Sequence, residues 1–229
     1  MVINNVSKLL LAYLIYAGSF LSFAAGNPDS TNIILPKPQM DKGKPLMQAL
    51  KQRKSSRDFK PDKLSPQVLS NLLWAAFGIN RPGSNLRTAP SAMNWQEIDI
   101  YVAMEAGLYL YDAKANMLQP VLARDVRGDT GRILQPFVKE APVNLVYVAD
   151  LSRVSTMGKV FVSNEEELTY SSVSAGTMVQ NVYLFCASEG LATVVRGMVD
   201  KDALAKDARL TPKQKIIIAQ TVGYPKAGK

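Results

Sequence analysis

Residues 171–195 read SSVSAGTMVQNVYLFCASEGLATVV, and this stretch decides the fold class. Its apolar residues recur at helical spacing, which predicts a helix over Ser171 to Glu189 that is buried on most of its circumference. Gly190 is a suitable cap for that helix, and Leu191 to Val195 predicts a strand directly after it. The two adjoining apolar sides of the helix are formed by Val173, Met178, Val182 and Phe185 and by Val179, Tyr183 and Cys186. A long helix followed by a strand indicates helices packed on a sheet.

The rest of the chain predicts further helices and strands that complete such a layered domain. Val143 to Ala149 is a nearly continuous apolar run, which is typical of a buried central strand. Helices are predicted over Met47 to Arg53, Ser65 to Phe77 and Asp200 to Arg209, and strands over Ile98 to Met104, Leu108 to Tyr111, Val143 to Ala149 and Lys215 to Val222. Because these elements do not alternate regularly as βαβ units, we expect one α+β domain with a central, mostly antiparallel sheet flanked by helices.

The composition excludes several classes of enzyme. The chain has 229 residues, of which 47% are hydrophobic and 20% are charged, so it falls in the ordinary globular range. It contains no histidine, which removes Ser-His-Asp and Cys-His nucleophilic sites and histidine-based zinc sites. The single cysteine, Cys186, excludes intrachain disulfides and cysteine-based metal sites. A difficult reaction would therefore depend on a bound cofactor.

The first 26 residues resemble an export signal. Lys8 is their only charged residue, and Leu9 to Ala25 is an apolar run that ends in small side chains. We expect residues 1–26 to be a cleaved signal peptide and the mature protein to be exported, with the periplasm as its compartment and no stable membrane insertion after cleavage. The alternative is an uncleaved N-terminal membrane anchor. Residues 27–44, which are rich in proline, predict an extended leader before a domain over residues 45–229.

Positive charge is concentrated in one segment. The formal net charge is +8, and the stretch from Asp41 to Lys63 alone carries eight Lys or Arg residues against three Asp. This pattern indicates an anion-binding site, with a solvated helix face as the plain alternative. Nucleic acid is not the expected partner, because no recognisable nucleic-acid-binding motif accompanies the charge.

Four segments carry residue types that suit ligand binding. Arg53 to Phe59 interleaves Arg and Ser, which can hold a phosphate from several directions, although a solvated basic turn has the same composition. Arg87 to Gln96 brings small residues and amides that can meet a heteroaromatic ring edge, and the alternative is an ordinary loop. Glu189 to Thr193 is either a helix cap or a ligand contact. Gly223 to Lys226 ends the last strand and offers a lysine.

Taken together and in order, these segments resemble the nitroreductase superfamily. The resemblance is carried by RKSSRDF at 53–59, LLWAAFGINRP at 72–82, RTAPSA at 87–92, Gln180-Asn181, Gly190-Leu191 and VGYP at 222–225. It spans roughly residues 45–226 and is nearest to the branch of azoline dehydrogenases from peptide-modification clusters. The resemblance implies an FMN-binding α+β fold, assembled as an intertwined homodimer with flavin sites at the subunit interface.

The resemblance also implies roles for individual residues. Arg53 and Ser55 match residues that contact the FMN phosphate and ribityl chain, with Lys54 between them, and Arg57 matches a basic residue near the pyrimidine edge of the ring. The loop that touches the ring is matched by Pro90, Ser91, Ala92 and Asn94. Leu191 and Ala192 match the segment whose backbone amide approaches the flavin N5, and Lys226 or Lys229 would reach the phosphate. The chain departs from the family pattern at Met93, Glu97 and Ala192, where many members have Gly, Pro and Gly.

The function implied by this resemblance is FMN-dependent oxidoreduction. Hydride would pass through the flavin N5 from a donor such as NAD(P)H to a small acceptor such as a nitroaromatic or a quinone, with no catalytic residue needed from the protein. One alternative is a flavin dehydrogenase acting on a peptide or heterocyclic substrate. Another is a flavin-binding protein without turnover.

Overall fold

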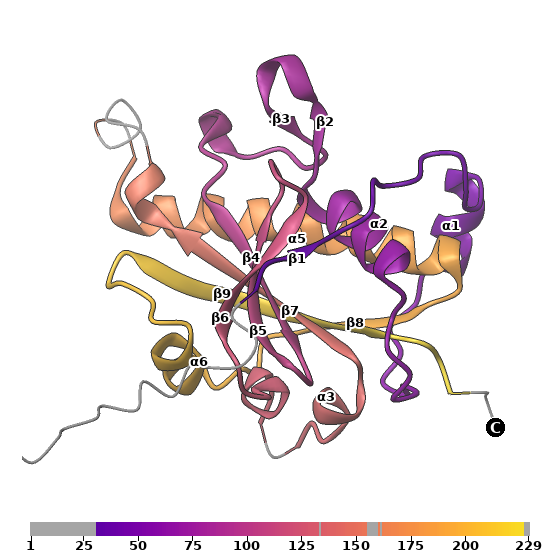
Figure 1. The fold of residues 1–229 in the computed structure, drawn as a ribbon. Helices are drawn as coiled ribbons and strands as arrows, with labels where there is room; N and C mark the ends of the chain where they lie inside the picture. Colours follow the sequence, from indigo (N-terminus) through magenta and orange to yellow (C-terminus); the bar gives the residue numbers. More distant parts are fainter. Residues whose placement is uncertain (1–30, 133, 155–159, 161, 227–229) are drawn as a thin grey trace, which may run out of the picture.

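The structure, a computed structural model, describes residues 31–132, 134–154, 160 and 162–226. Within these residues seven strands form one antiparallel sheet in the order β1-β6-β5-β4-β7-β9-β8, with helices packed against it (Figure 1). The strands are β1 (Ile33–Ile34), β4 (Ile98–Met104), β5 (Gly107–Asp112), β6 (Met117–Leu122), β7 (Val143–Asp150), β8 (Ala192–Arg196) and β9 (Gln214–Gly223). A separate two-stranded sheet joins β2 (Ile79–Arg81) to β3 (Leu86–Arg87). The expected α+β architecture is confirmed.

The sequence predicted most strands of the sheet but missed one of its two edges. The predicted strands correspond to β4, β5, β7, β8 and β9, and β7 lies inside the sheet between β4 and β9, as its apolar run indicated. Neither β1 nor β6 was predicted. Strand β6 contains Gln119 and Pro120, and proline is unfavourable within a ladder. It is tolerated here because β1 pairs only with Met117 and Leu118, which leaves the rest of β6 as an edge.

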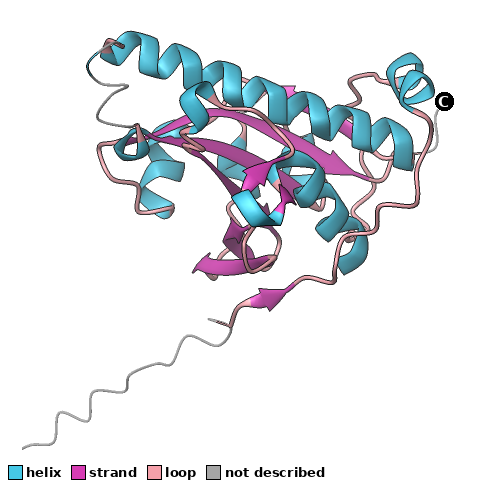
Figure 2. Ribbon diagram, turned by 90° about the horizontal axis from the view of Figure 1, so that it is seen from above, coloured by secondary structure: helices cyan, strands magenta, loops and turns pink. Residues whose placement is uncertain are grey.

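The helices lie on both faces of the sheet, and the longest, α5 (Asn164–Glu189), crosses one face over its length (Figure 2). The others are α1 (Leu46–Gln52), α2 (Pro66–Phe77), α3 (Phe137–Glu140) and α6 (Lys201–Asp207). Side chains of α2 and α5, such as Leu72 and Met178, share one core with Ile100. On the opposite face Leu204 of α6 joins a second core with Val146.

Helix α5 differs from the prediction in two ways. It begins seven residues before Ser171, because Ser163 and Glu166 form a capping box, each side chain bonding the other's backbone N–H. Val173, which the apolar pattern assigned to a covered side of the helix, is exposed in the isolated chain. Val173 is 62% exposed, and Tyr170, nearly one turn before it, is also exposed. Leu168 is exposed too, but it lies about 140° around the helix from Val173. Tyr170 and Val173 lie about 60° apart around the helix and form an apolar surface that we call the α5 face.

The predicted leader, from residue 31 on, packs along the domain. Leu35 is buried in the core beside α2, and the Asn116 side chain donates to the carbonyls of Leu35 and Pro36 at 3.3 and 2.9 Å. Further along, the Lys44 N–H donates to Ser188 Oγ at the end of α5, at 2.6 Å. No helix among the described residues has the length and apolar character needed to cross a bilayer.

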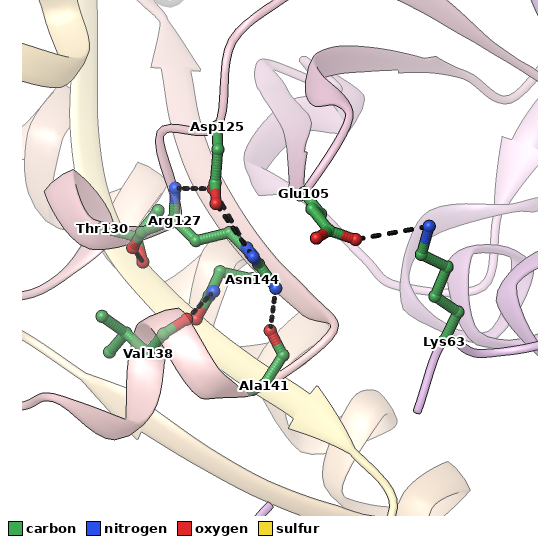
Figure 3. A network of polar contacts seen from close by, with 8 residues as sticks. All are labelled: Lys63, Glu105, Asp125, Arg127, Thr130, Val138, Ala141 and Asn144. Carbon is green, nitrogen blue, oxygen red and sulfur yellow. Dashed lines mark hydrogen bonds and ion pairs between the residues drawn. The ribbon is translucent and has the colours of Figure 1, made fainter. Parts of the chain in front are cut away.

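Two buried arginines tie the sheet to the segments that precede β7. Arg127 forms an ion pair with Asp125 at 2.8 Å and donates to the Ala141 carbonyl at 3.1 Å (Figure 3). Arg196, at the end of β8, donates to neutral oxygens of Thr130, Asn144 and Thr221. Burial without a carboxylate partner lowers the pKa of Arg196 to about 10.

Asn144 is the residue on which the Arg196 cluster depends. Its Oδ1 accepts from Arg196 at 2.9 Å and from Thr221 at 2.7 Å, and its Nδ2 donates to the Val138 carbonyl at 2.7 Å. We expect Asn144→Ala to lower the free energy of unfolding by about 2–3 kcal/mol, because it strips an acceptor from a buried cation. Urea unfolding measures this. The exposed Asn80→Ala is the control, with a loss below about 0.5 kcal/mol; equal losses for the two variants would contradict the assignment.

Candidate functional site

The candidate site is a cavity of about 680 Å³ at the C-terminal end of α5. It holds four residues singled out from the sequence: Lys54, Leu191, Ala192 and Lys226. The rest of its lining comes from Lys44, Gln52, Ser56, Asp58, Tyr183, Cys186, Ala187, Gly190, Thr193 and Pro225. A larger cavity of about 750 Å³ lies between the N-terminal half of α5, α6 and β9, and none of the predicted residues lines it. Convergence of the predicted residues therefore selects the smaller cavity.

The basic segment after α1 is held in place by backbone hydrogen bonds on two sides. The Ser56 N–H donates to the Thr193 carbonyl of β8 at 2.9 Å. The Lys60 N–H donates to the Tyr224 carbonyl at 2.8 Å, and the Lys226 N–H donates to the Asp58 carbonyl at 3.2 Å. Phe59, which lies within this segment, is completely buried. The segment therefore forms a fixed wall of the cavity, rather than the solvated turn that its composition also allowed.

Tyr183 of α5 contacts two of the predicted site residues. The Arg53 guanidinium carbon lies 5.2 Å from the centre of the Tyr183 ring, and the Ser55 Oγ lies 2.8 Å from the Tyr183 hydroxyl. Arg57 is exposed on the same segment. Sequence reasoning placed Tyr183 in the apolar side of a helix and assigned it no role in the site. Its phenol oxygen is the only feature of that sequence position that could have indicated one.

The turn from α5 into β8 forms the floor of the cavity. Gly190 has φ +74°, the left-handed conformation that ends many helices. The Leu191 N–H donates to the Cys186 carbonyl at 2.8 Å, so this amide is committed to the helix end. Ala192 begins β8 and is 4% exposed. Burial raises the pKa of the Cys186 thiol, which keeps it protonated and consistent with a packing role.

The cavity has an excess of positive charge. Lys44, Lys54 and Lys226 line it against a single carboxylate, Asp58. Lys226 also lies 2.8 Å from Glu140, and this hydrogen bond raises the pKa of the lysine, so its ammonium stays charged. Lys44 reaches the cavity from the leader and was not predicted. Lys229, the other predicted lysine, lies outside the described residues.

The second group of predicted residues lies elsewhere in the chain. Pro90, Ser91, Ala92 and Asn94 form a loop with a short 3₁₀ helix, η2 (Ala92–Asn94), and none of them lines the cavity. This loop lies against the N-terminal half of α5, where the Trp95 and Tyr170 rings are 6.2 Å apart. Tyr170 and Tyr183 are separated by about 20 Å along the helix axis, at 1.5 Å per residue. A single chain therefore does not bring the two groups together.

The loop is held in an unusual backbone conformation. Met93, Asn94 and Gln96 have φ of +47°, +55° and +50°, in the left-handed region. At the position of Met93, many members of the family that the sequence resembles have glycine. Glycine adopts such φ angles without strain. The left-handed conformation costs a residue other than glycine about 1 kcal/mol. Other contacts must therefore hold the loop in place.

Gln96 supplies those contacts. Its Oε1 accepts from Arg87 Nε at 2.8 Å, and its Nε2 donates to Asn85 O at 3.2 Å and to Asn94 Oδ1 at 3.0 Å. Its backbone N–H donates to Ser91 Oγ at 2.9 Å. Gln96 was expected to offer its amide to a ring edge, but the structure uses that amide inside the loop. Arg87, which stacks on Phe77 at 4.7 Å, is the anchor that the sequence did not reveal.

Comparison with known proteins bears on the family and the fold of the chain. The model of the nitroreductase family matches residues 50–224. A candidate nitroreductase of Methanocaldococcus jannaschii is 29% identical over 160 residues, covering 66% of this chain and 78% of its own. A crystal structure of a candidate nitroreductase from Ralstonia eutropha JMP134 has a TM-score of 0.80 and 41% identity, covering 90% of this chain and 94% of its own. The NADPH:FMN oxidoreductase of Vibrio harveyi has a TM-score of 0.60 at 18% identity, covering 80% and 69%, which is a likeness of fold.

We expect Gln96→Ala to loosen the loop, because three hydrogen bonds that hold its left-handed residues are lost together. Amide hydrogen exchange over residues 91–97 should become at least about tenfold faster, corresponding to about 1.4 kcal/mol of lost local stability. Gln119→Ala, which removes a hydrogen bond to Asp112, serves as the control and should leave this exchange unchanged. Unchanged exchange in Gln96→Ala would show that the side chain does not hold the loop.

Proposed function

Because the chain belongs to the nitroreductase family, we propose that it is an FMN-dependent oxidoreductase. The observation that carries the proposal is the meeting of residues from three separate stretches of the chain, 44–58, 183–193 and 225–226, at one cationic cavity. Lys44, Lys54, Ala192 and Lys226 line it, and Arg53 and Ser55 lie beside it through their contacts with Tyr183. The first stretch is more than a hundred residues from the other two, so their convergence is a property of the fold.

The donor set suits FMN. A phosphate dianion needs cations and N–H or O–H donors, which Arg53, Lys54 and Ser55 offer on one segment and Lys226 on another. The apolar floor at Leu191 and Ala192 provides a surface against which a flat ring can pack. The volume of about 680 Å³ falls within the range of small-molecule and cofactor sites. The residues present therefore fit the group.

Bound FMN would supply hydride transfer through its N5, and the chain itself would bind and orient. Arg57 would stabilise the negative charge that a reduced flavin ring carries near its pyrimidine edge. We propose a reduced donor such as NAD(P)H and a small acceptor such as a nitroaromatic or a quinone. None of the protein's steps in this scheme requires a histidine.

We further propose that the functional unit is a homodimer. The loop at 90–94 lies about 20 Å along α5 from the residues that contact Arg53 and Ser55. If the α5 helices of two subunits pack antiparallel about a two-fold axis, the N-terminal half of one lies beside the C-terminal half of the other. The loop of one subunit would then complete the cavity of its partner. The exposed α5 face of Tyr170 and Val173 supplies an apolar surface for that contact.

A dehydrogenase acting on a peptide or heterocyclic substrate is the second candidate. The motif at 72–82, which spans the end of α2 and β2, favours it, since it resembles the azoline dehydrogenase branch. The microcin synthetase complex of Escherichia coli has a TM-score of 0.64 at 17% identity, covering 99% of this chain and 84% of its own, which is again a likeness of fold. The N-terminal segment leads us to propose export as well, in which case a quinone is a more accessible electron partner than a cytoplasmic nucleotide.

We expect the purified chain to bind FMN and to show the near-ultraviolet and blue absorbance bands of oxidised flavin, which bleach when a donor reduces the cofactor. Arg53→Ala should raise the Kd for FMN at least about tenfold, because a charge-assisted phosphate contact is worth about 1.5–3 kcal/mol. Arg132→Ala, an exposed arginine outside the cavity, should leave the Kd unchanged.

Three results would count against this proposal. A protein that stays colourless through FMN titration excludes flavin chemistry. Bound flavin that no donor reduces and no acceptor reoxidises indicates a binding protein without turnover. Equal effects of Arg53→Ala and Arg132→Ala on the Kd would mean that the basic segment does not hold the phosphate.

We expect Val173→Glu to convert the dimer to monomers, because a buried carboxylate at an apolar interface lacks a partner. Light scattering after gel filtration should show the halved mass, and FMN binding should weaken with it, since the loop of the partner is removed. Glu165→Gln, on the exposed first turn of α5, is the control and should keep the dimer. A wild-type chain that is monomeric yet binds FMN tightly would refute the shared site.

A further inference from the structure

Tyr183 connects three segments at the edge of the candidate cofactor cavity. Its ring is 6% exposed and lines the cavity. Its hydroxyl oxygen accepts from the Val195 N–H of β8 at 3.0 Å and lies 2.8 Å from the Ser55 Oγ. The Arg53 guanidinium lies over the ring at 5.2 Å. One side chain of α5 therefore touches β8 and both Arg53 and Ser55 of the basic segment.

The hydrogen-bond count favours one direction for the Tyr183–Ser55 contact. The Val195 N–H already donates to the phenol oxygen, so the phenol proton needs an acceptor of its own. Ser55 Oγ is the acceptor within reach. When the phenol donates to it, every group is satisfied except the Ser55 proton, which remains available to a ligand. In the reverse direction Ser55 donates its proton to Tyr183, and the phenol proton then has no acceptor among the hydrogen bonds of the described residues.

The surroundings of Ser55 indicate which kind of group accepts its hydroxyl proton. Ser55 follows Arg53 and Lys54 directly on the basic segment, and Ser55 and Arg53 both contact Tyr183. A donor hydroxyl beside a guanidinium and an ammonium suits an anionic oxygen, and hydrogen bonds in a chain strengthen one another. The ring of Tyr183 adds a surface that keeps the Arg53 guanidinium close to that hydroxyl.

We propose that Tyr183 is a positioning residue that makes the site specific for a phosphorylated flavin. It orders a relay in which the Val195 N–H donates to Tyr183, Tyr183 donates to Ser55, and Ser55 donates to a phosphate oxygen. Tyr183 itself does not touch the phosphate. The inference rests on the proposed function. It adds Tyr183 as a residue that affects flavin affinity only when the flavin carries a phosphate.

The test compares FMN with riboflavin, which lacks the phosphate, by fluorescence titration of each variant. Tyr183→Phe keeps the ring and removes the hydroxyl, so the Kd for FMN should rise at least about fivefold, while the Kd for riboflavin changes less than about twofold. Ser55→Ala should give the same pattern. The double variant should be no weaker than either single one, because all three break the same relay. Inorganic phosphate should compete with FMN less effectively in Tyr183→Phe than in the wild type.

Two controls separate positioning from stability. Tyr111→Phe removes a tyrosine hydroxyl outside the cavity and should leave both flavin affinities unchanged. Ser55→Ala retains the Val195–Tyr183 bond, so it remains informative if Tyr183→Phe lowers the thermal midpoint of the flavin-free protein. Equal weakening of FMN and riboflavin, or an unchanged Kd for FMN in Tyr183→Phe, overturns the inference and leaves the proposed function standing. A wild-type protein that binds neither flavin overturns both.

Discussion

The packing of α5 on the sheet is the constraint on which the rest of the structure depends. Its buried side, which includes Ala175, Met178 and Val182, lies on the face formed by β4, β7 and β9. The helix thereby fixes two places at once. Its C-terminal half presents Tyr183 and Gly190 to the basic segment, and its N-terminal half receives the loop at 90–94 through the Trp95–Tyr170 contact. Any displacement of the helix would move both groups of candidate residues.

Local signals in the sequence account for most of the fold that could be predicted. Ser65 caps α2 as expected, with its side chain accepting from the Val68 N–H. The apolar run at 143–149 forms β7, which lies inside the sheet. Strand β6 was missed because Pro120 hides its pattern, and the start of α5 was missed because its first turn is acidic rather than apolar. Val173 was placed in the core because helical spacing identifies an apolar position without showing what covers it. A single chain does not explain why this apolar side chain is exposed.

The residues of the candidate site also divide into those that the sequence identified and those that only the fold reveals. Residues that act through their own charge, such as Lys54 and Lys226, could be named from the sequence, and both line the cavity. Residues that act through a contact could not, because a contact requires the fold. Tyr183 looks like core in the sequence, and Gln96 looks like a ligand-binding amide, yet the first contacts Ser55 and the second supports its own loop. Lys44 reaches the cavity because the leader packs against the end of α5, which no local pattern indicates.

The loop at 90–94 shows how such support compensates for a departure from a family pattern. A methionine at Met93 keeps the left-handed angle that glycine would adopt freely, at a cost of about 1 kcal/mol. The hydrogen bonds of Gln96 and the stacking of Arg87 on Phe77 offset that cost from outside the strained residue. Met93, whose side chain is exposed, belongs to η2, and η2 packs against α5. The exposed Met93 side chain becomes part of an apolar contact if a second subunit covers it. The backbone strain of the loop is thereby connected to the homodimer proposed for the site.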